Sequence, residues 1–179
     1  RNSRITNAMQ TGVLKPQDLV VALAVSVSFA RDWTFAGVAA RAGISVSEVH
    51  AAAKRLEAAG LLRDRAVNRP ALLEFLEHGV RYVFYAQRGS PTRGVPTGVG
   101  APPLRDRFQT ADIPVWPSEH GTVRGYALSP LYRTVPDATH RDVELYEALA
   151  LVDAIRDGGA RERLAAMEEL RQRLGGPSR

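Results

Sequence analysis

Five side chains between Ser47 and Arg55 combine hydrogen-bonding groups with positive charge. Ser47, Glu48 and His50 come first, and Lys54 and Arg55 follow. Serine and histidine can hydrogen-bond to several base edges, and glutamate can accept from the amino group of cytosine. Lysine and arginine contact phosphate oxygens. This order is typical of a helix that enters the major groove of DNA with its N-terminal half, although an ordinary solvated helix face is the alternative.

The sequence contains few residues in the spacing that a catalytic or metal site requires. Its four histidines are scattered, and none has metal-ligand spacing from another histidine or a carboxylate. The absence of cysteine excludes disulfides, thiol catalysis and cysteine-bound zinc. There is no phosphate-loop motif and no GxSxG motif. We therefore expect a protein that is not an enzyme, with no catalytic residue, no cofactor and no metal.

The spacing in residues 33–62 predicts two short helices joined by a tight turn. Thr34 can cap the first helix, whose apolar side chains recur at helical intervals. Gly43 can adopt the positive φ that ends a helix. Ser45 can cap the second helix, and Glu48 three residues later fits a capping box, so Glu48 has a structural alternative to base contact.

This pattern resembles the winged helix-turn-helix of bacterial transcription regulators such as the MarR and GntR groups. The features that match are the alanines at 39, 40 and 42, the AGIS turn, Val49 and the ending KRLEAAGLL. They cover residues 15–65, about a third of the chain. The resemblance implies a dimeric, sequence-specific DNA-binding regulator, most simply a repressor. A winged-helix module that binds protein instead of DNA is the alternative.

Four further segments belong to the predicted DNA-binding domain, residues 13–100. Residues 61–63 are expected to form a short strand, residues 70–78 a helix and residues 80–86 a strand. The Gly- and Pro-rich segment 87–100 is expected to lack regular structure. It could be the wing, with Arg88 and Arg93 on the DNA backbone, or a flexible surface connection. The residues predicted to contact DNA are Thr34, Ser45, Ser47, Glu48, His50, Ala51, Lys54, Arg55, Arg88 and Arg93.

The rest of the chain is expected to support this domain. The predicted fold is mainly α with a small β part (α+β). Residues 15–30 should form a buried first helix. The Pro-rich residues 101–136 should form an extended segment that packs on the core or on a partner subunit. A small-molecule pocket lined by Trp116, Tyr126 and Tyr132 is the less common alternative to packing. Residues 137–179 should form a helical hairpin, broken near Gly158. Its narrow apolar stripe suits docking on its own chain or across a homodimer axis, and the dimer is the favoured interpretation. An antitoxin-like autoregulator would bind a toxin-like protein partner here.

Charge and hydropathy agree with a nucleic-acid partner. The net charge is +5, and residues 61–107 hold eight arginines against four acidic residues, whereas residues 137–179 hold seven against nine. No apolar run approaches the length of a membrane helix, about 20 residues, and residues 1–8 lack the hydrophobic core of a signal peptide. We expect a cytoplasmic protein without membrane contact. Met9 is a candidate natural start, so residues 1–12 are treated as an N-terminal extension.

Overall fold

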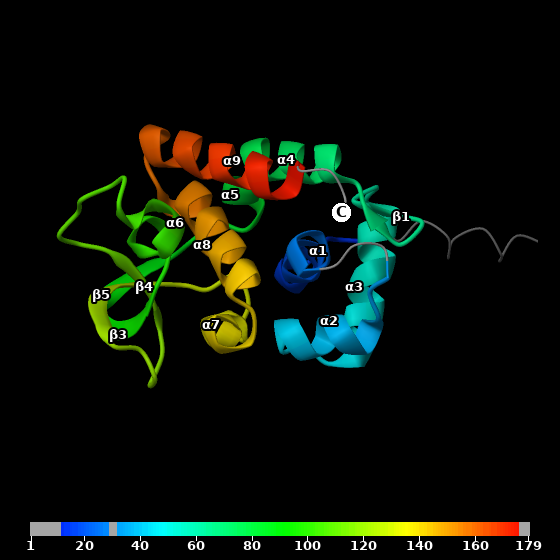
Figure 1. Ribbon diagram of the computed structural model, residues 1–179, viewed down its shortest axis with the longest axis horizontal. Coiled ribbons are helices and arrows are strands. Elements are labelled where there is room, and N and C mark those ends of the chain that lie inside the picture. Colours follow the sequence, from blue (N-terminus) through cyan, green and yellow to red (C-terminus); the bar gives the residue numbers. More distant parts are fainter. Residues whose placement is uncertain (1–11, 29–31, 176–179) are drawn as a thin grey trace, which may run out of the picture.

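Helix α8 (Val143–Asp157) lies at the centre of the fold. Eleven of its fifteen residues are buried. Helix α1 (Pro16–Ser28) packs on one side of it and α9 (Ala160–Gly175) on another, while the three strands between residues 88 and 128 lie beyond its remaining side (Figure 1). One hydrophobic core extends from Leu19 to Leu174. The helices that carry the predicted DNA-binding residues therefore share a core with the C-terminal helices.

The computed structural model describes residues 12–28 and 32–175. The predicted N-terminal extension lies almost wholly outside these residues, as does the predicted end of the first helix at residues 29–30. Within the described ranges, no helix is long and apolar enough to cross a membrane. The fold is mainly helical with small β-sheets, so the predicted α+β class is confirmed.

The predicted helix, turn and helix are present as α2 (Phe35–Ala42) and α3 (Val46–Ala58). Thr34 caps α2 by accepting from the backbone N–H of Gly37 at 3.0 Å. Ser45 caps α3 by accepting from the backbone N–H of Glu48 at 3.2 Å. Gly43, between the helices, has a φ of 65°. The caps and the positive φ were predicted correctly because each depends on residues adjacent in sequence.

A minimal hairpin follows α3. Its strands are β1 (Leu62–Arg63) and β2 (Ala66–Val67), which pair antiparallel across a two-residue turn. Helix α4 (Arg69–His78) comes next, with Asn68 as its N-cap, and confirms the helix predicted at residues 70–78. The strand expected at residues 61–63 is also confirmed.

The strand predicted at residues 80–86 is wrong. Its first half is the short helix α5 (Val80–Val83). The carbonyl oxygens of Phe84 and Tyr85 accept from the guanidinium of Arg156 on α8 instead of from a neighbouring strand. The alternation of apolar residues also does not track burial, because Val80 is buried whereas Tyr82, Val83 and Tyr85 are exposed.

The Gly- and Pro-rich segment is the first strand of a small closed barrel, so the prediction of irregular structure at 87–100 is wrong. Strand β3 (Arg88–Pro96) pairs antiparallel with β4 (Pro114–Pro117) and with β5 (Val123–Leu128), and β4 and β5 pair in parallel. A side chain at Gly94 would overlap the carbonyl of Trp116. One at Gly125 would overlap the carbonyl of Ile113. The glycines therefore allow three strands to close around so small a radius.

The region predicted to be extended, residues 101–136, contains β4, β5 and short helical turns. Helix α6 (Pro102–Arg105) lies within the region and η2 (Val135–Asp137) spans its end. The turn η1 (Gly98–Gly100) comes just before the region, and α7 (Ala138–Arg141) comes just after it. Trp116 is fully buried, and its indole N–H donates to the Asp153 carboxylate at 2.6 Å. This contact packs the barrel against α8, so Trp116 is a core residue and does not line a ligand pocket.

The predicted C-terminal hairpin is α8 and α9, separated at Gly158 and Gly159. Three members of the apolar stripe on α9, namely Met167, Leu170 and Leu174, are buried within the chain. The fourth, Leu164, is 70% exposed. The stripe is therefore used mostly for packing inside one chain, the first of the two alternatives that the sequence left open.

Candidate nucleic-acid interface

Helix α3 separates its packing residues cleanly from an exposed face. Its buried side chains are Val49, Ala52, Ala53 and Leu56. Ser47, His50 and Lys54 are exposed, and Ala51 is half-buried between them. These positions fall three or four residues apart, so their side chains lie on one side of the helix. The described part of the chain provides no ion-pair partner for Lys54, which leaves its ammonium group available to an anion.

The imidazole of His50 is held in a fixed place on this face. It stacks on the ring of Phe35, the first residue of α2, with 3.5 Å between ring centroids and 19° between ring planes. Phe35 in turn meets the buried Trp33 edge-on, with 5.1 Å between centroids. A side chain held by packing loses less conformational entropy on binding. The imidazole edge is thus oriented before any ligand arrives.

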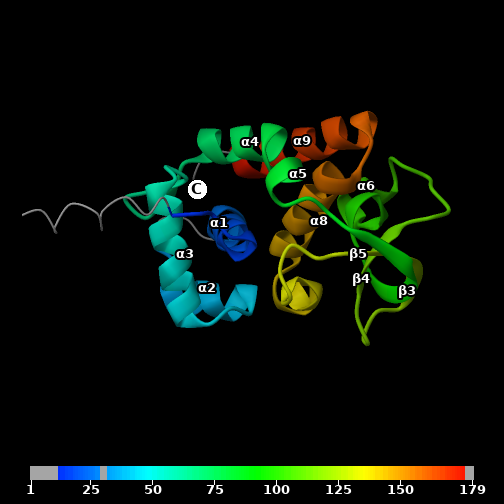
Figure 2. The same cartoon turned by 180° about the vertical axis from the view of Figure 1, so that it is seen from behind.

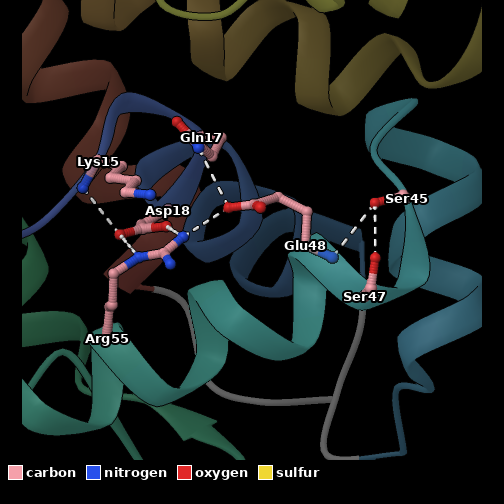
Figure 3. Close-up of polar contacts among 7 residues, drawn as sticks. All are labelled: Lys15, Gln17, Asp18, Ser45, Ser47, Glu48 and Arg55. Atoms are coloured by element: carbon pink, nitrogen blue, oxygen red, sulfur yellow. Dashed lines mark hydrogen bonds and ion pairs between the residues drawn. The ribbon is translucent and has the colours of Figure 1, made fainter.

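Glu48 and Arg55 turn away from the exposed face and bind α1 (Figure 3). Arg55 donates two hydrogen bonds to the buried Asp18, Nε to Oδ2 at 2.8 Å and one terminal nitrogen to Oδ1 at 2.7 Å. The same nitrogen donates to Glu48 at 2.6 Å, and Gln17 donates to that carboxylate at 3.1 Å. Hydrogen bonding from Arg55 lowers the pKa of Glu48. The same side-chain contacts, led by that to Asp18, raise the pKa of Arg55.

These contacts correct two of the predicted roles. We no longer assign Arg55 to a phosphate, because its guanidinium already binds two carboxylates within the chain. Glu48 is not assigned to a base, because its carboxylate is engaged by Arg55 and Gln17. The capping box is half formed, since Ser45 caps the helix but the Glu48 carboxylate accepts from Arg55 of α3 and Gln17 of α1. Both residues instead fix how α3 sits on α1.

The hairpin β1–β2 lies beside this face and is tied to the start of α2. Its two turn residues, Asp64 and Arg65, have φ values of 49° and 62°. The indole N–H of Trp33 donates to the carbonyl of Arg65 at 2.7 Å, and the Arg65 guanidinium donates to the carbonyl of Trp33. The guanidinium also lies over the indole, 4.3 Å from a ring centroid. These contacts offset the cost of left-handed backbone at two residues that are not glycine.

The hairpin arginines were not among the predicted DNA contacts, because the wing was expected later in the chain. Arg63 and Arg65 are both exposed, and strand β1, which carries Arg63, packs beside α3. Two short segments that each carry an apolar residue, Leu62-Arg63 and Ala66-Val67, flank the polar pair Asp64-Arg65, and this is the pattern that could have indicated the hairpin. Arg63 is the residue that we add to the candidate interface.

Arg88 and Arg93 are not part of a wing, because both belong to strand β3 of the barrel. The barrel lies at the opposite end of the long axis from α3 (Figure 1). Arg88 forms an ion pair with Asp157, Nε to Oδ1 at 2.6 Å, and lies over the ring of Tyr126. This pairing removes Arg88 from the predicted DNA contacts. Arg93 is exposed.

The segment around α7 fastens the C-terminal end of α2. The hydroxyl of Thr134 donates to the carbonyl of Ala42 at 2.9 Å. Arg41 forms a 3.0 Å ion pair with Asp142, which also caps α8 by accepting from Leu145. The guanidinium of Arg141 covers Gly43, so that a side chain there would meet its Cζ at 2.7 Å. The helix-turn-helix unit is therefore held at both ends by other parts of the chain.

Comparison with models of protein families, with curated proteins and with solved structures finds no match. Among the described residues, no group of three or more histidine, aspartate and glutamate side chains is placed to hold a metal ion. The candidate function therefore rests on the shape and chemistry of the α2–α3 unit.

Proposed function

We propose that this protein binds double-stranded DNA through α3 and acts as a sequence-specific transcription regulator. One observation carries the proposal: Ser47, His50 and Lys54 share the exposed face of a helix whose other side is fixed to α1 and α2. In the helix-turn-helix arrangement, the N-terminal residues of the second helix meet base edges. The hairpin that follows α3 supports assignment to the winged type.

The exposed residues divide by the part of DNA that each can contact. Ser47 and His50 lie in the first half of α3 and carry groups able to donate to or accept from bases. Lys54, one turn further on, suits a phosphate. Arg63 on the hairpin adds a second cation at the edge of the face. The hydroxyls of Thr34 and Ser45 cap helices, so their contribution is to place backbone N–H groups near phosphates.

We extend the proposal to a homodimeric repressor, because proteins with this motif commonly read two half-sites through a two-fold dimer. The apolar stripe of α9 is mostly buried in its own chain. The subunit contact would therefore use other apolar surface, such as the exposed Tyr82, Val83 and Tyr85. Sedimentation analysis of the purified protein should give twice the mass of one chain. A mass of one chain at micromolar concentration would remove the dimer from the proposal.

Binding to labelled duplex DNA at several salt concentrations tests the DNA-binding proposal. Affinity should fall steeply with salt, because each cation–phosphate contact releases counterions. Lys54→Ala should weaken binding to every sequence and lower the salt slope by about 1. Ser47→Ala and His50→Ala should instead change which sequences are selected from a random pool.

Arg161→Ala is the matched control, because Arg161 is also exposed but lies at the start of α9, away from α3. It should leave affinity and salt slope unchanged. Folded protein with no measurable duplex affinity at low salt would overturn the proposal.

A further inference from the structure

A second group of arginines lies along the same edge of the molecule as the α2–α3 unit. In both views of the ribbon, α2, α7 and the loop that joins β4 to β5 lie along one long edge, while α4 and α9 form the opposite edge (Figures 1 and 2). The first edge therefore extends from the proposed DNA-reading helix to the tip of the barrel. Its cations belong to segments that the helix-turn-helix pattern does not include.

Arg141, the last residue of α7, is a cation at the turn between α2 and α3. It is exposed, and its guanidinium covers Gly43. Its contacts within the chain are weak: a 3.3 Å hydrogen bond to the carbonyl of Thr134 and a 3.3 Å ion pair with Asp137, whose side chain is half exposed. Exposed ion pairs contribute little free energy. A phosphate could therefore replace Asp137 as the partner of Arg141 at little cost.

Arg93 and Arg124 lie further along this edge and directly face each other. They are register partners in the antiparallel pair β3–β5, and Arg124 is the second residue of β5, just after the β4–β5 loop. Both are exposed, and the described residues provide no ion-pair partner for either. Like charges directly opposite each other destabilise a strand pair. Arg88 on the same strand, in contrast, has Asp157 as its counter-ion.

We infer that Arg141 and the Arg93–Arg124 pair contact DNA phosphates and so continue the α3 interface along this edge. The bound duplex would then lie along the protein from the turn between α2 and α3 to the barrel. The inference rests on the proposed DNA binding. A phosphodiester between Arg93 and Arg124 would compensate the repulsion that the strand register imposes, and arginine forks match phosphate geometry. Glu119, the one acidic residue of the β4–β5 loop, reduces the positive charge there but leaves an excess of cations.

Duplexes of two lengths test the inference, because only a long duplex can reach both ends of the edge. The protein, its double variant Arg93→Ala/Arg124→Ala and the single variant Arg141→Ala would be titrated with duplexes of about 12 and about 30 base pairs; one helical turn is about 10 base pairs. Salt slopes would be measured for each. Each lost phosphate contact should lower the slope by about 0.9.

The double variant should lose about 1.8 from the slope on the long duplex, from two contacts at about 0.9 each, and show a clearly smaller change on the short one. Arg141→Ala should lose about 0.9 on both. The double variant Arg93→Lys/Arg124→Lys should keep the wild-type salt slope. Arg161→Ala, on the opposite edge, should change the salt slope on neither the short nor the long duplex. A double variant with the wild-type slope on the long duplex, while Lys54→Ala still lowers it, would overturn this inference alone. Absence of duplex binding by the wild-type protein would overturn both proposals.

Discussion

The guanidinium of Arg55 holds the carboxylate of Asp18 at two points, with donor–acceptor distances of 2.8 and 2.7 Å. Asp18 is fully buried near the start of α1, and Arg55 lies towards the end of α3. The pair therefore sets the position of the proposed DNA-reading helix on its neighbour. Arg55 matters to the interface through geometry, although it does not belong to the exposed face.

Arg55→Ala should destabilise the protein by about 3 kcal/mol, because removing one partner leaves the other charge buried and unpaired. Chemical denaturation measures this loss directly. Lys54→Ala, next to it but exposed, should change stability by less than about 0.5 kcal/mol. Equal effects of the two substitutions would contradict the structural role assigned to Arg55.

Gly43→Ala should lower stability by about 1–2 kcal/mol, because Gly43 has a φ of 65° and a left-handed backbone costs other residues that much. It should also displace the Arg141 guanidinium from the turn. Thermal unfolding would report the first effect and the salt slope of DNA binding the second. Gly60→Ala, which has a φ of 73° and open space around it, is the control that shares the strain but not the contact.

The two tyrosines that contact α8 or belong to it should ionise late. Burial raises the pKa of Tyr126, with its hydrogen bond to Asp157 adding to the effect, and burial raises that of Tyr146 to about 12. An unfolded tyrosine ionises near pH 10. The folded state therefore keeps protons that the unfolded state loses, so stability is present below pH 10 and declines as the pH rises above it.

Absorbance of tyrosinate during an alkaline titration should show Tyr126 and Tyr146 ionising after the ordinary range, together with unfolding. Tyr126→Phe should remove one late-ionising group and the contact to Asp157 at 2.7 Å. Complete ionisation of all five tyrosines near pH 10 in protein that is still folded would contradict the burial of these two side chains.

Trp33→Phe should loosen the hairpin β1–β2 without unfolding the core. It removes the indole donor to the carbonyl of Arg65, which is worth about 1 kcal/mol. In the variant, amide hydrogen exchange should speed up at Arg63 and Ala66 and stay unchanged in α1. If exchange were unchanged in the hairpin, the indole contact would not be what holds it.

The parts that the sequence predicts well are those set by neighbouring residues. The turn at Gly43, the caps at Thr34 and Ser45 and the split of α3 into two faces all follow from spacing within a few positions. The role of Arg55 could not be predicted this way, because its partner Asp18 is 37 residues away. Strand β3 was missed for the same reason. Gly94 fits this strand because the carbonyl of Trp116, 22 residues away in the sequence, leaves no room for a side chain. Local patterns are silent about such distant partners.

The central position of α8 has a consequence for synthesis of the protein. A growing chain that has reached residue 100 already contains every residue of α1, α2, α3 and the hairpin, but not α8, one of the helices against which α1 packs. Those helices would emerge from the ribosome with part of their apolar surface uncovered, and would obtain their stable arrangement only after Asp157 had followed. A fragment that ends before α8 should therefore be poorly folded and prone to aggregate, however complete its helix-turn-helix appears.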